Sequence, residues 1–223
     1  MIIKVCGLRE PENIREVTAL GIDWIGFVFQ QQSPRYVKMI PSGSGIMPDR
    51  PMLSSLKVKQ TPKKVGVFID PMAQDVITRV YTFNLDIVQL NGKETPTLLR
   101  NLRRTLDNNV KLMKTISVGC SADIAIYKDY ADCADYFLFN VMPSAGADAM
   151  LRPDWSVLKT YDGEVPFLLG GEMTQDDIPA LCSISSYARC MGLDLGNAFE
   201  LAAGVKDLPL LSRFVEQLRA CSV

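Results

Sequence analysis

Histidine is absent from the 223 residues of this sequence. Its absence excludes Ser-His and Cys-His nucleophile pairs and the zinc motifs built on histidine ligands. Any acid or base catalysis must therefore use carboxylates, cysteine, lysine or tyrosine. The six cysteines lie far apart with no C-x-x-C pair, so their spacing predicts no metal site and no disulfide scaffold. We expect most of them to be buried thiols.

Long apolar runs and a strong charge of one sign are also missing. No stretch approaches the roughly 20 apolar residues that span a bilayer, and the opening MIIKVCG is too short and wrongly flanked for a signal peptide. The formal net charge is −1, and the basic residues are spread along the chain. This pattern argues against nucleic acid or a membrane as partner. We expect a cytoplasmic protein that binds a small molecule.

The sequence does contain a repeated order of apolar runs and helical segments. Eight runs have the continuous hydrophobicity of strands buried on both faces: 2–6, 24–29, 64–69, 85–90, 110–116, 135–140, 165–170 and 189–195. Segments with helical spacing lie between them, as at 11–20, 71–83 and 95–106. Eight units of about 28 residues predict a (β/α)8 barrel in one domain. An open doubly wound sheet is the alternative, but no run is followed by G-x-G-x-x-G.

One unit departs from this order. Residues 38–64 contain four prolines and a Ser-Gly-Ser-Gly run, with no clear apolar helical face. We predict an irregular excursion after the second strand, and flexible-linker chemistry favours a surface loop over a functional lid.

Catalytic residues of such barrels lie where the strands end and the following loops begin. That rule selects Cys6, Arg35, Asp70, Gln89, Asn91, Asn140, Gly170, Gly171 and Asp194. A cysteine beside a strand is more often a small core side chain than a reactive thiolate, although Gly7 allows a turn that leaves the sulfur at the mouth. Arg35 fits equally well a surface charge and a planar fork for a carboxylate or phosphate.

Several segments together resemble the phosphoribosylanthranilate isomerase family, the (β/α)8 enzymes of tryptophan biosynthesis. They include IIKVCGLREPENI (2–14), GFVFQQQSPRYV (26–37), VQLNGKE (88–94) and GLDLGNAFELAAGVKD (192–207). The resemblance covers nearly the whole chain apart from 38–64. It implies an Amadori rearrangement of N-(5′-phosphoribosyl)anthranilate, in which an acid opens the furanose ring and a base removes the C2′ proton. It also implies that no cofactor is needed and that the protein is a monomer or homodimer.

The resemblance assigns roles to particular residues. Cys6 matches the general base, and Arg35 matches the residue that holds the anthranilate carboxylate. Other substrate contacts are implied at Gln89, Asn91, Gly171, Asp194, Gly196 and Asn197. Counting back without gaps from Asp154-Trp155 places the family's acid, an aspartate, at Asn140. An amide cannot supply a proton at neutral pH.

The chain departs from the family at further positions. The family has a G-G-x-G-K motif after its acid, and the same count aligns this motif with residues 147–151, which lack glycine and include Asp148. In the loop after the seventh predicted strand, Glu172 matches the second glycine of the family motif. In the alternative alignment Gly170-Gly171 match the two glycines and one residue is inserted after them. Asn197-Ala198 replaces Ser-Gly or Ser-Arg, and the histidine of Q-L-H-G is replaced by asparagine.

We therefore expect a family isomerase with activity at least 10²-fold below a typical member, because a general acid contributes about 10²–10⁴ in rate. Asp148 is a minority candidate for a substitute acid. The alternative is a catalytically silent homologue that binds another carboxylate-bearing ligand, or a partner, at the barrel mouth.

Overall fold

The eight predicted strands form one closed parallel barrel in chain order, β1 to β8. A computed structural model provides this description for residues 1–38, 61–143, 153–184 and 186–221. The strands are β1 (Ile2–Cys6), β2 (Trp24–Val28), β3 (Lys63–Phe68), β4 (Ile87–Leu90), β5 (Lys111–Val118), β6 (Tyr136–Val141), β7 (Phe167–Gly170) and β8 (Cys190–Leu195). The predicted (β/α)8 fold is confirmed.

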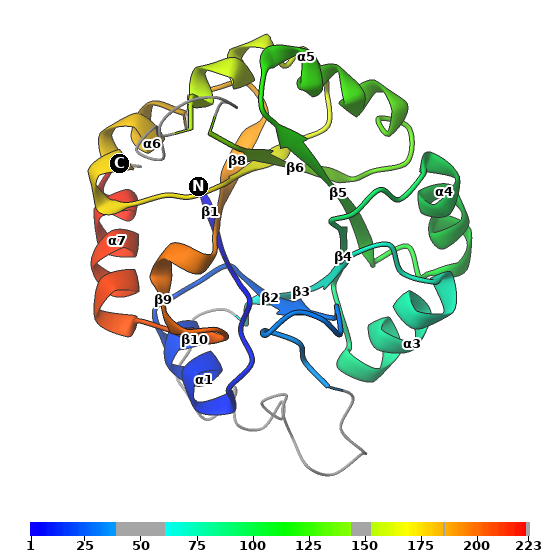
Figure 1. Ribbon diagram of the computed structural model, residues 1–223, viewed down its shortest axis with the longest axis horizontal. Coiled ribbons are helices and arrows are strands. Elements are labelled where there is room, and N and C mark those ends of the chain that lie inside the picture. The colour runs from blue at the N-terminus through cyan, green and yellow to red at the C-terminus, as the bar shows by residue number, and fades with distance from the viewer. Residues whose placement is uncertain (39–60, 144–152, 185, 222–223) are drawn as a thin grey trace.

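Helices surround the barrel, as the view along its axis shows (Figure 1). They are α1 (Pro11–Ala19), α3 (Ala73–Phe83), α4 (Pro96–Thr105), α5 (Ser121–Ile124), α6 (Ile178–Ile184) and α7 (Leu208–Ala220). Helix α4 shows how the sequence sets their limits: Pro96 occupies its first turn and the Thr95 side chain accepts a hydrogen bond from the Leu98 amide. Its Leu99 and Leu102 are fully buried against the barrel.

Two apolar layers result from the alternation of side chains along each strand. The inner layer fills the barrel with Trp24, Val65, Val67, Ile87, Met113, Leu138 and Leu168. The larger outer layer packs the other strand face against the helices. None of the helices among the described residues is long and apolar enough to cross a bilayer.

The helical layer is less regular than the repeat predicts. After β5 comes the one-turn helix α5 followed by the 3-10 helix η1 (Ala125–Asp129). After β6 the described residues contain the 3-10 helix η2 (Trp155–Thr160), and after β8 a short antiparallel pair, β9 (Glu200–Ala202) and β10 (Val205–Lys206). Two further 3-10 turns are η3 (Gln175–Asp177) and η4 (Asn197–Phe199).

The predicted excursion falls mostly outside the described residues. Residues 39–60 are not described, and the last two positions of the predicted segment, Lys63 and Lys64, belong to β3. Lys63 pairs in register with Trp24 of β2, so the strand takes up the last two residues of the segment assigned to the excursion.

The expectation that most cysteines are buried thiols is wrong. Of the four free cysteines, Cys133 is buried, Cys6 and Cys190 are half-buried, and Cys120 is exposed. Cys182 of α6 and Cys221 at the end of α7 form a disulfide with 5.8 Å between their Cα atoms. The two helices pack side by side, and a pairing across 39 residues leaves no local spacing pattern in the sequence.

Candidate active site

A cavity of about 620 Å³ opens at the C-terminal end of the barrel. The nine residues predicted to catalyse or bind substrate all line it: Cys6, Arg35, Gln89, Asn91, Asn140, Gly171, Asp194, Gly196 and Asn197. Gly170 and Glu172 also line this cavity, which we call the mouth cavity, whereas Asp70 does not. Asp148 lies outside the described residues. A second cavity of about 480 Å³ lies among the N-terminal ends of β3 to β5, away from these residues.

Cys6 ends β1 on the inner side of the barrel, where its thiol meets β2. A Cβ atom added to Gly26 would lie 2.9 Å from Cys6 Sγ, so the absence of a side chain at position 26 leaves the thiol its room. Gly7 then turns the chain with φ +84°, in the left-handed region that favours glycine. The thiol therefore sits at a tightly built strand end facing the mouth cavity.

Burial is the main influence on the Cys6 thiol and raises its pKa. Lys4 pulls this pKa down, Asp194 pushes it up, and the net direction is upward. Lys4 is fully buried, and its Nζ donates to Asp194 Oδ2 at 2.7 Å. Burial would lower the pKa of Lys4, but Asp194 and Cys6 outweigh it and the pKa is raised, so Lys4 stays an ammonium.

Arg35 forms an ion pair across the opening of the barrel. Its Nε donates to both carboxylate oxygens of Glu200 at 2.9 and 3.0 Å, and its Nη2 donates to Oε2 at 2.6 Å. Lys206 Nζ donates to Glu200 Oε1 at 2.9 Å. Burial would raise the pKa of Glu200, but these two cations outweigh it and hold the pKa below its usual range. The Arg35 guanidinium, predicted to bind the carboxylate of a ligand, thus already binds the carboxylate of Glu200.

Gln89 and Asp194 bring two buried hydrogen-bond acceptors to the cavity lining. Gln89 Nε2 donates to Asn91 Oδ1 at 3.3 Å and to Thr115 Oγ1 at 3.2 Å. Gln89 Oε1 and Asp194 Oδ1 are buried and have no hydrogen-bond partner within the described part of the chain. An unpaired buried acceptor is costly, so both atoms suit a ligand with hydroxyl or amine donors.

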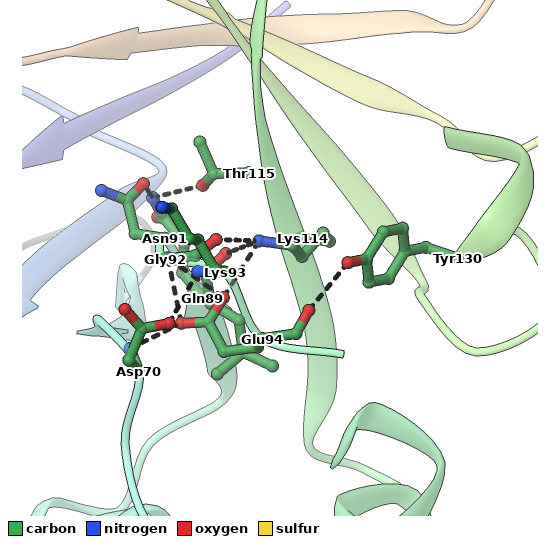
Figure 2. Close-up of polar contacts among 10 residues, drawn as sticks. Asp70, Gln89, Asn91, Gly92, Lys93, Glu94, Lys114, Thr115 and Tyr130 are labelled. Carbon is green, nitrogen blue, oxygen red and sulfur yellow. Dashed lines mark hydrogen bonds and ion pairs between the residues drawn. The ribbon is translucent and has the colours of Figure 1, made fainter. Parts of the chain in front are cut away.

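The turn after β4, which carries Asn91, is held by a buried ion pair (Figure 2). Lys114 of β5 donates to Glu94 Oε2 at 3.0 Å and to the Gly92 carbonyl at 2.7 Å. The Glu94 carboxylate also accepts from the backbone amides of Gly92 and Asp70, each at 3.0 Å. Asp70 Oδ1 in turn accepts from the Lys93 amide at 2.6 Å. Asp70 therefore holds this turn in place from the end of β3.

Asn140 lies on β6, in register with Gly170 of β7, and is half-buried. Its Nδ2 donates to Met142 Sδ at 3.4 Å, a weak acceptor. Gly171, directly after Gly170 at the end of β7, has φ +128°, and a Cβ at this position would lie 2.7 Å from the Val141 carbonyl oxygen. The next residue, Glu172, is exposed at the edge of the cavity.

Comparison with known proteins identifies the family. The family model described as N-(5′-phosphoribosyl)anthranilate (PRA) isomerase matches residues 3–217. The chain belongs to the PRA isomerase family. It is 37% identical over 218 residues to the N-(5′-phosphoribosyl)anthranilate isomerase of Parabacteroides distasonis, covering 98% of this chain and 93% of the relative. The corresponding protein of Phocaeicola vulgatus is 32% identical over 219 residues, covering 98% of each chain.

Solved PRA isomerase structures share the barrel. The Thermotoga maritima protein superposes with a TM-score of 0.77 at 23% identity, covering 99% of this chain and 100% of that one. A PRA isomerase in complex with reduced 1-(o-carboxyphenylamino)-1-deoxyribulose 5-phosphate gives a TM-score of 0.76 at 22% identity, with the same coverage. At these identities the likeness shows the fold.

Sequence reasoning did not single out two charged residues beside the mouth cavity. Lys4 and Lys206 lie within the family-like segments 2–14 and 192–207, yet only the structure shows that they are 0% and 1% exposed and paired with carboxylates. A lysine within an otherwise apolar strand run was the available signal for Lys4. Among the described residues, no group of three or more His, Cys, Asp or Glu side chains could hold a metal ion.

Proposed function

We propose that this chain catalyses the Amadori rearrangement of N-(5′-phosphoribosyl)anthranilate in tryptophan biosynthesis, at a rate limited by the absence of its general acid. The observation that carries the proposal is that Cys6 of β1 and Asn140 of β6 line the same cavity, together with Arg35. A base, an acid position and a cation thus surround one small-molecule volume.

In this reaction the acid protonates the furanose ring oxygen, the C1′–O bond breaks, and the nitrogen lone pair forms the C1′=N iminium. The Cys6 thiolate then removes the C2′ proton. The electron pair of that C–H bond becomes a C1′=C2′ bond, and the iminium pair returns to nitrogen. Tautomerisation of the enol gives the ketose. Substrate and product are isomers, and the steps transfer protons without net oxidation or reduction, so the scheme requires no cofactor.

Asn140 supports the reduced rate. Its amide can donate a hydrogen bond to the ring oxygen but cannot transfer a proton. The lost factor of about 10²–10⁴ corresponds to about 3–5 kcal/mol of transition-state stabilisation. The raised pKa of the Cys6 thiol lowers the thiolate fraction at neutral pH and slows the second step as well.

We place the anthranilate carboxylate near Arg35 and the phosphate near Gly171, Gly196 and Asn197. The unpaired oxygens of Gln89 and Asp194 belong to residues that line the same cavity, and we assign them to accept hydrogen bonds from the ribose hydroxyls. Glu172 supports weak binding, because it lines the cavity directly after Gly171, where its negative charge would repel a phosphate dianion in this placement.

A tryptophan auxotroph that lacks this isomerase tests the proposal. The natural chain and the Cys6→Ala variant are expressed at matched levels, and the purified proteins are assayed on N-(5′-phosphoribosyl)anthranilate. We expect slow growth with the natural chain, none with Cys6→Ala, and kcat/KM at least 10²-fold below a typical family member. Turnover at the rate of a typical member would contradict the impaired-enzyme proposal, and turnover that survives Cys6→Ala would contradict the role of Cys6.

A second function is favoured by Glu172: binding of a carboxylate-bearing ligand that has no phosphate, without turnover. Calorimetry with anthranilate and with inorganic phosphate separates the two. Binding of anthranilate to a protein without isomerase activity would support the silent homologue. Detectable turnover of the phosphorylated substrate would exclude it.

We further propose that the chain acts in the cytoplasm as one barrel domain, as a monomer or homodimer. The Thermotoga maritima enzyme is dimeric, and monomers of it have been generated. Light scattering on the purified protein determines the oligomeric state.

A further inference from the structure

Lys4 and its partner Asp194 place two charges in a barrel interior that is mostly filled by apolar side chains. Lys4 lies two residues before Cys6 on β1, so both side chains point to the same, inner face of the strand. Cys6 itself packs against the inner apolar layer. Lys4 is 0% exposed, and it donates a hydrogen bond to Asp194, its register partner on the neighbouring strand β8.

Stability alone does not account for this pair. A buried ion pair is often no more stabilising than well-packed apolar side chains of the same volume, because both charges lose their hydration. Bulky branched side chains are the usual filling of barrel interiors. A lysine beneath a cavity-lining thiol therefore points to a role in the chemistry of that thiol.

Charged groups approach Cys6 from several elements. Lys4 comes from its own strand, Asp194 from β8, Lys206 from β10, and Arg35 from the segment after β2, while the uncharged Gly26 of β2 lies against the sulfur. Lys206 and Arg35 both form ion pairs with Glu200, whose carboxylate offsets their positive charge. Lys4 exerts the strongest pull toward the ionised thiol of all the groups facing it.

We propose that Lys4 is a positioning residue for Cys6: its buried ammonium, held in place by Asp194, stabilises the thiolate that acts as base. The proposal rests on the proposed function for the use of that thiolate. The stabilisation itself is a property of the resting protein and can be measured without substrate.

Iodoacetamide alkylation across a pH series, quantified for each cysteine peptide by mass spectrometry, reports the ionisation of each thiol. In Lys4→Met we expect the midpoint for Cys6 to rise by at least one pH unit, a tenfold loss of thiolate at a given pH below both midpoints. Lys4→Arg keeps the positive charge, so its Cys6 midpoint is expected to stay close to that of the natural chain. The exposed Cys120 is the internal control and keeps its midpoint in every variant.

Lys114→Met is the matched control variant, because Lys114 is also a buried strand lysine paired with a carboxylate. It is expected to leave the Cys6 midpoint unchanged. An unchanged or lowered Cys6 midpoint in folded Lys4→Met, checked by circular dichroism, would overturn the proposal.

If Lys4→Met does not fold, Asp194→Asn provides the test. It removes the charge that disfavours the thiolate and leaves the ammonium in place, so the Cys6 midpoint should fall. A midpoint that stays or rises would again overturn the proposal. A shifted midpoint in a protein without isomerase turnover would retain the role of Lys4 and reject only the proposed function.

Discussion

Asn140→Asp is expected to raise kcat for N-(5′-phosphoribosyl)anthranilate about 10²-fold or more. The change replaces one amide by an isosteric carboxyl at a half-buried position whose Oδ1 lies 3.6 Å from the Cβ that Gly170 lacks. The described contact that it loses is the 3.4 Å donation to Met142 Sδ. We therefore expect a stability change within about 0.5 kcal/mol.

The expected gain follows from what the new group does in the transition state. Proton donation to the ring oxygen contributes about 10²–10⁴, or about 3–5 kcal/mol. We expect the low end of this range for kcat, because the loop after β6 keeps its departures from the family sequence. An acid that acts only in the transition state raises kcat and leaves KM nearly unchanged. The nearby carboxylates of Asp194 and Glu172 favour the protonated form of the new carboxyl.

Steady-state kinetics on purified proteins and growth of the auxotroph measure this effect together. Asn91→Asp is the matched control, since it adds a carboxyl to the same cavity from the turn after β4. It should give no gain. Equal kcat for the natural chain and Asn140→Asp, with both proteins folded, would refute the missing-acid reasoning, as would an equal gain from Asn91→Asp.

Three other perturbations probe the site and its support. Glu172→Gly should lower KM for the phosphorylated substrate about three- to tenfold by removing a repulsive charge, with kcat unchanged; an unchanged KM in steady-state kinetics would contradict repulsion at the phosphate end. Because burial raises the pKa of the Cys6 thiol and only the thiolate acts as base, kcat should keep rising with pH beyond the ordinary thiol value of about 8.5, and a plateau below pH 8 would argue against Cys6. Lys114→Met leaves the fully buried Glu94 carboxylate without its cation and should cost about 3–5 kcal/mol in thermal or urea unfolding. Adding Glu94→Gln should recover part of this loss, and an undiminished melting temperature in the single variant would show that the pair does not stabilise the turn.

The barrel was predictable because each strand is buried on both faces and therefore appears as an uninterrupted apolar run. Strand β6 is an example: the run at 135–140 corresponds to Tyr136–Val141. The helical layer was less predictable. The segment after β5 forms only one α-helical turn before changing to a 3-10 helix, and apolar spacing does not distinguish the two over so few residues.

The composition of the mouth cavity was predictable from position, since strand ends meet at one face of a barrel. The ion pairs of the charged residues around this cavity were not predictable from the sequence. Arg35 and Glu200 are 165 residues apart, and no local pattern indicates that the guanidinium already holds a carboxylate. The Cys182–Cys221 disulfide escaped prediction for the same reason, because only the packing of α6 against α7 brings the two sulfurs together.

The pairing of β1 with β8 has a consequence for synthesis of the chain. Lys4 and Asp194 are separated by 190 residues, which take about 10–40 s to translate at 5–20 residues per second. During that time the first strand, with its lysine and reactive cysteine, has no partner on one side. A strand edge left open during synthesis is prone to pair with other chains. We therefore expect newly made protein to be most prone to such pairing until the eighth strand emerges from the ribosome.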